Sequence, residues 1–224
     1  MTKKLTDDQG NVQNNTDTDL EILQSLERSF YRANPSSAKR NTAKSLKWFQ
    51  QFVPKNFNRV RTARMFRDRN MWTDQIIPGQ MLFFEYDALH KDTLPVWDRF
   101  PLTFMWDVWT GGPGKFGLPG KKYAIGINLH YLPPALRFEA MKALLTLRSE
   151  KRYRKSTKLK LSWEILAGLS QSKYFEHSVK IYRLDHVSSK FVNIPARSWE
   201  LAVFLPTARF QKGSNKEAWR LKSK

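Results

Sequence analysis

Carboxylates in the central part of the sequence are the residues whose types and spacing could do chemistry. Glu85 and Asp87 stand two positions apart, on one face of a strand if a strand extends that far, and Asp98 and Asp107 follow. Converging carboxylates hold Mg²⁺ in metal-dependent nucleases. However, Asp87 leads into a polar turn, where acids equally form salt bridges and turn hydrogen bonds. A metal-dependent nuclease is therefore an alternative, and we expect no catalytic residue, metal or other cofactor.

The remaining catalytic and metal-binding patterns are incomplete. No two of the four histidines are spaced four apart, and the chain has no cysteine to supply thiolate ligands. Gly112 and Gly117 have the spacing of a phosphate-binding loop, but Leu118 stands where that loop has lysine. No Gly-x-Ser-x-Gly nucleophile motif is present. We interpret residues 111–120 as a hairpin tip and expect the protein not to be an enzyme.

Positive charge is the strongest signal in the sequence. The 224 residues contain 39 Lys and Arg against 20 Asp and Glu, which gives a formal net charge of +19. This composition is typical of nucleic-acid-binding domains, and a polyanion would relieve the self-repulsion. Hydrophobic residues make up 41% of the chain, enough for a folded core, yet no apolar run approaches the roughly 20 residues of a membrane helix. We expect DNA as a partner and no membrane.

Three basic clusters carry most of this charge: residues 39–69, residues 148–160 and the C-terminus from residue 209. Lys and Arg side chains in such clusters bind phosphates, and aromatic side chains among them can stack on exposed bases. We expect the first cluster to contribute most, because its cations share helix faces. The predicted nucleic-acid-binding residues are Arg40, Lys44, Lys47, Arg61, Arg64, Arg67, Arg69, Lys151, Arg152, Arg154, Lys155 and Lys158, with Tyr153 and Trp219 as stacking aromatics.

Hydrophobic periodicity predicts an α+β fold in a single domain over residues 36–212. Residues 36–72 are basic with helical spacing, residues 79–132 change to period two, and residues 133–210 return mostly to helical spacing. We expect a small antiparallel β-sheet, or a partly closed barrel, flanked by helices from both sides of the sequence.

Several elements within this domain can be placed more closely. The clearest strand is predicted over residues 123–131, where large apolar residues alternate with small and polar ones. Pro133 and Pro134 can open a helix, because proline fits the first helical turn. Further helices are predicted over residues 174–187 and after Pro195.

Both ends of the chain are predicted to lie outside the domain. Residues 1–35 are net acidic and are predicted to form a mostly disordered tail, disordered to residue 18, with a short helix from Leu20 to Tyr31. The start is polar and lacks the apolar stretch of a signal peptide. Residues 213–224 are predicted to form a basic C-terminal tail.

Several short strings in this chain resemble one phage protein family. The most specific is Gly-Ile-Asn-Leu-His-Tyr-Leu-Pro-Pro at residues 126–134, preceded by Lys-Asp-Thr-Leu-Pro at 91–95 and Asp-Arg-Phe-Pro-Leu at 98–102. The strings at 185–187 and 199–206 are similar to the C-terminal half of the same family. Over about residues 38–220 the sequence resembles the DNA end protector family of T-even-like tailed bacteriophages.

The resemblance implies a non-catalytic virion protein that binds the termini of packaged linear genome DNA and shields them from host exonuclease. It would be synthesised in the host bacterial cytoplasm and would meet other phage virion subunits in the virion. The alternative is a structural neck, head-completion or baseplate protein that uses the same basic surface for subunit contacts.

Overall fold

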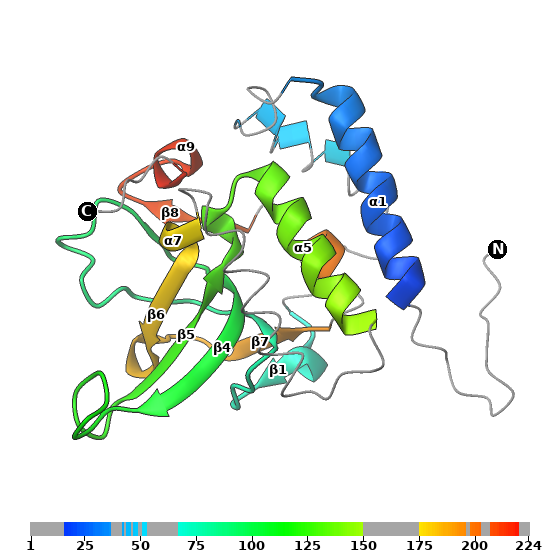
Figure 1. Ribbon diagram of the computed structural model, residues 1–224. Helices are drawn as coiled ribbons and strands as arrows, with labels where there is room; N and C mark the ends of the chain where they lie inside the picture. Colours follow the sequence, from blue (N-terminus) through cyan, green and yellow to red (C-terminus); the bar gives the residue numbers. More distant parts are fainter. Residues whose placement is uncertain are drawn as a thin grey trace, which may run out of the picture.

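An antiparallel sheet with helices on one face is the framework of the protein (Figure 1). It was obtained as a computed structural model, which describes residues 16–36, 42, 44–45, 47–48, 51–52, 67–149, 175–195, 198–202 and 207–219. The main sheet has the strand order β1-β7-β2-β4-β5-β6, and β3 pairs with β8 in a second sheet. The strands are β1 (Trp72–Thr73), β2 (Met81–Phe83), β3 (Trp97–Asp98), β4 (Leu102–Thr110), β5 (Lys122–Asn128), β6 (Val179–Arg183), β7 (Phe191–Ile194) and β8 (Phe210–Gln211).

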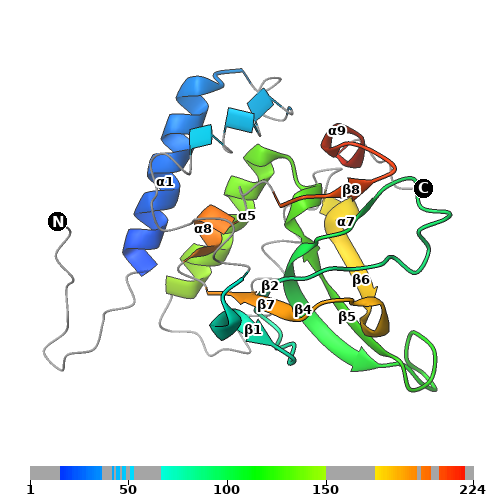
Figure 2. The same cartoon turned by 180° about the vertical axis from the view of Figure 1, so that it is seen from behind.

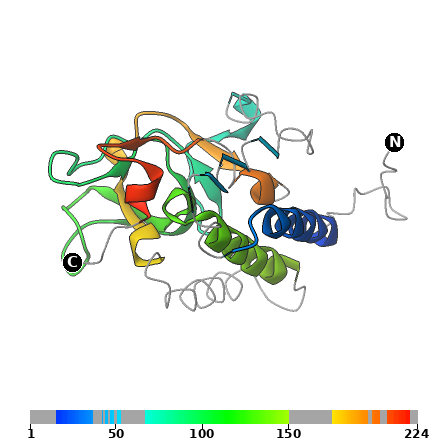
Figure 3. The same ribbon diagram turned by 90° about the horizontal axis from the view of Figure 1, so that it is seen from above.

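Two long helices, α1 and α5, lie side by side on one side of this sheet, with the short α8 beside them (Figures 2 and 3). The other helices are short. The helices are α1 (Thr16–Ala33), η1 (Arg69–Met71), η2 (Leu129–Tyr131), α5 (Pro134–Ser149), α7 (Phe175–Ser178), η4 (Leu184–His186), α8 (Trp199–Ala202) and α9 (Asn215–Ala218). The predicted α+β class is confirmed, and the sheet is open, so the partly closed barrel is not the form it takes.

The strand predicted over residues 123–131 is confirmed as far as Asn128, and the prediction is wrong for residues 129–131, which form η2 because the Asn128 side chain accepts from the His130 N–H and turns the chain. The alternation along β5 explains how this strand joins two hydrophobic clusters. Ile127 and Leu129 are buried in the cluster beneath α1 and α5, whereas Ala124 belongs to the cluster on the other face of the sheet. Pro134 begins α5, as predicted. This helix buries Ala140 and Leu144 in the hydrophobic cluster beneath α1 and α5.

The prediction of disorder up to residue 18 is wrong for residues 16–18, which begin the helix α1, and α1 packs against the domain instead of belonging to a mostly disordered tail. Leu23, Leu26 and Phe30 recur on one side of α1 and are buried. The ring centroid of Phe30 lies 5.4 Å from that of Phe138 on α5. The helix predicted from Leu20 to Tyr31 is therefore confirmed as part of the core, and it extends further toward the N-terminus because acidic residues favour a first helical turn.

The predicted helix over residues 174–187 is also wrong. Within that range α7 ends at Ser178 and is followed by β6 and η4, and the mostly helical region further contains β7 and β8. β6 pairs with β5, placing Ile181 opposite Ile125. Such pairing between distant segments outweighs a local apolar spacing that suits either a helix or a strand.

The C-terminal tail predicted over residues 213–224 is folded structure as far as residue 219. Residues 213–219 are folded against the domain, and a capping box between Ser214 and Glu217 begins α9. Ala218 and Trp219 are buried beside Val96 and Tyr131. The prediction that the tail starts at residue 213 is wrong because these two apolar side chains find partners far away in the sequence.

Candidate nucleic-acid interface

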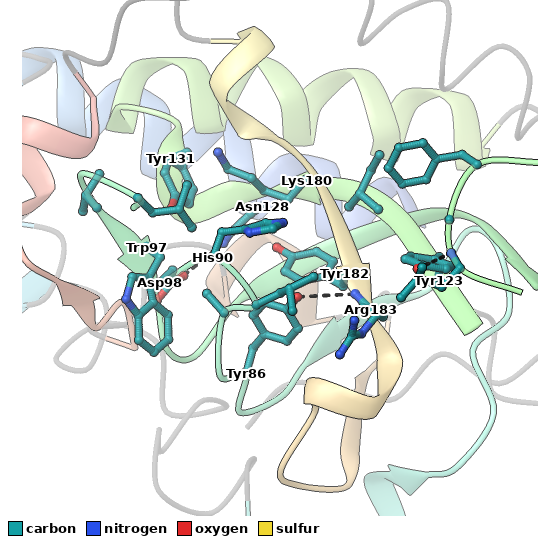
Figure 4. Close-up of a pocket in the computed structure, with 18 residues that line it drawn as sticks. Tyr86, His90, Trp97, Asp98, Tyr123, Asn128, Tyr131, Lys180, Tyr182 and Arg183 are labelled. Carbon is teal, nitrogen blue, oxygen red and sulfur yellow. Dashed lines mark hydrogen bonds between the residues drawn. The ribbon is translucent and has the colours of Figure 1, made fainter. Parts of the chain in front are cut away.

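A cavity of about 450 Å³ opens beside β6, the edge strand of the main sheet (Figure 4). Its lining comes from residues within 86–98, 116–118, 123–131 and 180–183. The volume lies within the range of about 300–1,000 Å³ typical of ligand pockets. Segments far apart in the sequence therefore meet in one concave site.

Pairing with β5 positions the side chains that β6 contributes. Lys180 lies opposite Gly126, and Tyr182 lies opposite Ala124. Alternate residues of a strand share a face, so Lys180 and Tyr182 project to the same side. The buried hydroxyl of Tyr182 lies 3.1 Å from Thr103 Oγ1, and burial raises the pKa of Tyr182.

Asp98 and Asn128 form a buried polar end of the cavity. Asn128 Nδ2 donates to Asp98 Oδ2 over 3.1 Å, and His130 Nδ1 lies 2.6 Å from the same oxygen. The backbone N–H groups of Phe100 and Arg209 donate to Asp98 Oδ1. Burial alone would raise the pKa of Asp98, but the charge and hydrogen bond of His130, with the other donors, hold it below its ordinary value. The carboxylate is fully engaged, so it anchors loops rather than binding a ligand.

The glycine-rich loop is the hairpin tip that the sequence predicted, between β4 and β5, and it also walls the cavity. The rings of Trp109 and Tyr123 stack with centroids 5.6 Å apart. Trp109 Nε1 donates to the Phe116 carbonyl oxygen, and the Tyr123 hydroxyl accepts from the Leu118 N–H. Gly117 has a φ of 102°, and a Cβ there would collide with the Tyr123 ring. Glycine at this position lets the loop close onto the hairpin.

Two cations of β6 line the cavity, and they project from opposite faces of the strand. Among the described residues Lys180 forms no ion pair, and its Nζ lies 4.1 Å from the Tyr131 ring centroid. Burial lowers the pKa of Lys180 to about 8. Arg183 is partly neutralised, because its Nε donates to Asp185 Oδ1 over 2.6 Å. Figure 4 shows Lys180, Asn128 and Tyr131 on one side of β6 and Tyr123 on the other.

The cavity has an apolar rim. Phe116, Leu118 and Ile181 are 66%, 55% and 45% exposed, and Leu89 and Leu94 are exposed on the opposite loop. Ile181 alternates with Lys180 along β6, and Phe116 packs on Tyr123, so this part of the rim lies across β6 from Lys180. The Tyr131 ring lies on the Lys180 side. A ring beside an unpaired cation matches the chemistry of a nucleotide, which combines a flat base with a phosphate. The cavity beside β6 is therefore the candidate binding site in the described part of the chain.

The structure describes only part of the predicted nucleic-acid-binding set. Lys44, Lys47, Arg67 and Arg69 are exposed. The described part of residues 44–52 is helical and lies beside α1, whereas η1 and β1 lie at the other end of the molecule (Figure 1). Neither group lines the cavity. The predicted residues that fall outside the described part are Arg40, Arg61, Arg64, Lys151, Arg152, Tyr153, Arg154, Lys155 and Lys158.

Trp219 does not have the exposed ring that a stacking role requires. Its side chain is 3% exposed, and its Nε1 donates to the His130 carbonyl oxygen over 2.9 Å. The guanidinium of the buried Arg137 lies 6.0 Å from the Trp219 ring centroid. The prediction of a stacking role for Trp219 is wrong in this conformation, because the ring completes a polar network beneath η2.

The carboxylates considered for a nuclease have separate partners. Glu85 Oε1 pairs with Arg99 Nη2 at 2.7 Å, and Asp87 Oδ2 pairs with Lys91 Nζ at 2.8 Å. Asp98 is buried in its own network, as described above. The described residues contain no group of three or more His, Asp or Glu side chains placed to hold a metal ion.

Sequence reasoning missed Lys180 and Arg183. Neither lies in a basic run, and both fall in the stretch interpreted as a helix. The available signal was the run Val-Lys-Ile-Tyr-Arg at residues 179–183, which is rich in β-branched and aromatic residues and is typical of a strand.

Comparison with known proteins gives the family. No curated protein and no solved structure matches the chain significantly. No helix within the described residues is long and apolar enough to cross a membrane. The family model of the phage T4 terminal DNA protecting protein matches residues 1–223. The chain therefore belongs to the phage T4 terminal DNA protecting protein family.

Proposed function

We propose that this protein binds the termini of linear phage genome DNA and shields them from host exonuclease. The observation that carries the proposal is membership of a terminal DNA protecting family over residues 1–223. The net charge of +19 supplies the attraction that any DNA-binding mode requires. Protection needs occupancy of the end and no bond cleavage, so the protein acts as a non-catalytic cap.

The ion pairs at the surface support this proposal. Asp74, Glu85, Asp87 and Asp185 each pair with a Lys or Arg side chain. Acids held this way neutralise only their neighbours, and among the described cations Lys44, Lys47, Arg67 and Arg69 are exposed to meet phosphates. With 6–10 phosphate contacts, affinity would fall about 10³–10⁵-fold between 50 and 200 mM salt. A basic surface used only for contacts with other virion subunits would not show DNA binding with this salt dependence.

We place the protein in the virion, beside other phage subunits and on the ends of the packaged genome. The exposed cations Lys44, Lys47, Arg67 and Arg69 are proposed phosphate contacts, together with the predicted residues outside the described part. These contacts would follow the duplex backbone without reading its sequence.

Exonuclease protection tests the proposal. Linear duplex is incubated with the protein at about physiological salt, and a processive double-strand exonuclease is then added. The protein should lengthen the survival of full-length duplex. An endonuclease acting on the same DNA is the control, because end capping should not slow internal cleavage. Equal slowing of both enzymes would indicate coating of the duplex, and no slowing of the exonuclease would refute end protection.

A further inference from the structure

The cavity beside β6 points to a more specific role in DNA-end recognition. We propose that it holds the last, unpaired nucleotide of a DNA end, with the base among the aromatic and apolar side chains and the phosphate near Lys180. The inference rests on the proposed function and adds the site and the chemical form of its ligand.

The first argument is the unpaired cation. No anion among the described residues neutralises Lys180, whose ammonium lies 4.1 Å from the Tyr131 ring centroid. Removing a charge from water without a partner costs stability, and an incoming phosphate would supply the missing partner. Burial lowers the pKa of this ammonium to about 8, so most of it carries charge at neutral pH.

The second argument is the shape and polarity of the lining. Trp97 is half-buried, and its ring and that of Tyr131 line the cavity on the side of β6 where Lys180 lies. Bases stack on such rings regardless of sequence, because each base has a π-face. A binding mode independent of sequence is what a protein acting on DNA ends requires.

The third argument concerns size. A cavity of about 450 Å³ accommodates a single nucleotide but no duplex. Proteins that enclose a base in a pocket take it out of the stack, at a cost that is lowest when the base is already unpaired. The cavity therefore selects an overhanging or frayed terminal nucleotide over an internal base pair. Lys115 and Lys122 are exposed on the adjoining β4–β5 hairpin, where they can meet phosphates of the following duplex.

A fluorescent terminal base tests this inference. Duplexes carry 2-aminopurine as the last base of a short 3′ or 5′ overhang, and a control duplex carries it at a central base pair. The wild-type protein should change the fluorescence of the terminal base for at least one overhang polarity and leave the central base unchanged. Lys180→Met should weaken binding to that overhang about tenfold.

Two further variants make the result interpretable. Lys142→Met removes the same charge from an exposed site on α5, where Lys142 Nζ lies 3.9 Å from Glu27, and should weaken binding less than twofold. Trp97→Ala removes a ring on the Lys180 side of the cavity and should reduce the terminal-base signal, with folding of the variant checked by circular dichroism. If DNA ends are protected but the terminal base is silent, or Lys180→Met matches Lys142→Met, the nucleotide pocket is wrong and end protection stands. If the wild type protects no ends, the proposed function itself fails.

Discussion

The helix-covered side of the sheet and the edge at β6 use apolar side chains for different purposes. Under α1 and α5, Leu23, Leu26 and Phe30 are closed off from solvent by Phe138 and its neighbours. At β6, apolar and aromatic side chains instead surround an open cavity that contains Lys180. Complete burial gains stability, whereas an open apolar rim with an unpaired cation gives up stability for a surface that can bind. Substitutions should therefore cost much stability under the helices and little or none at the cavity.

Two phenylalanines provide the largest expected contrast. Phe30→Ala should lower the free energy of unfolding by about 4 kcal/mol, because the fully buried ring leaves a cavity between α1 and α5. Phe116→Ala should lower it by less than about 0.5 kcal/mol, because the ring is 66% exposed. Urea unfolding followed by circular dichroism measures both. Similar losses of unfolding free energy in the two variants would contradict the view that the helix-covered side is closed core and the edge at β6 is an open surface.

The buried network beneath the cavity should respond next most strongly. Asp98→Asn should destabilise the protein by about 3 kcal/mol at pH 7, because it breaks the buried contact between Asp98 and His130. The pKa of Asp98 is lower in the folded protein than the 3.8 of the unfolded chain. Its stabilising contribution is therefore present above pH 3.8 and is lost as the pH falls through the folded value. Acid titration of stability should show this loss in the wild type and a weaker one in the variant.

The helix-covered region could be predicted from the sequence more completely than the cavity. Leu23, Leu26 and Phe30 lie within one helix, so their spacing alone predicts a buried face, and β5 shows its alternation equally clearly. The edge strand β6 was missed because its place depends on pairing with β5, more than 50 residues earlier. Local spacing holds no information about such pairing.

The candidate site shows the same limit. Basic runs predicted phosphate contacts by charge, and that argument does not depend on the fold. Lys180 stands alone between Val179 and Ile181, and only the tertiary structure brings it to Tyr131 and Asn128. Trp219 shows the converse error, because a tryptophan with few apolar neighbours in the sequence finds Val96 and Tyr131 in space.

Lys180 should behave unlike a core residue. Lys180→Met should raise the free energy of unfolding of the DNA-free protein by about 2 kcal/mol at pH 7, because it removes a buried charge whose pKa falls from 10.5 to about 8 on folding. The ammonium is destabilising below pH 8, and this penalty disappears as the pH rises from 8 to 10.5. The advantage of the variant should shrink over the same interval.

The other cavity groups with shifted pKa values titrate in the folded protein outside the range between pH 8 and 10, so they do not obscure the effect of Lys180. The pKa of Asp98 lies below 3.8, and burial raises those of Tyr86, Tyr131 and Tyr182 above 10.0. Thermal unfolding of the wild type and Lys180→Met across pH 7–10.5 provides the measurement. A variant that is less stable than the wild type at pH 7 would show that Lys180 has a structural anion partner.

Gly117, in the loop that walls the cavity, provides a further test. Gly117→Ala should lower the free energy of unfolding by about 1–3 kcal/mol, because φ is 102° and the new Cβ would collide with the Tyr123 ring. Since this loop walls the cavity, binding to overhanging DNA should weaken more than stability falls. Gly112→Ala is the matched control, as a Cβ there meets no atom within 4 Å. Equal effects of the two substitutions on overhang binding would argue against a shaped loop wall.

Competition between DNA ends and internal duplex tests the central claim most directly. The protein is bound to a labelled linear duplex at about physiological salt and challenged with a constant mass of one unlabelled plasmid, either closed or cut into increasing numbers of fragments. End recognition predicts that competition rises with the number of ends, and that the closed circle competes least. Competition that depends on DNA mass alone, whatever the number of ends, would contradict the account.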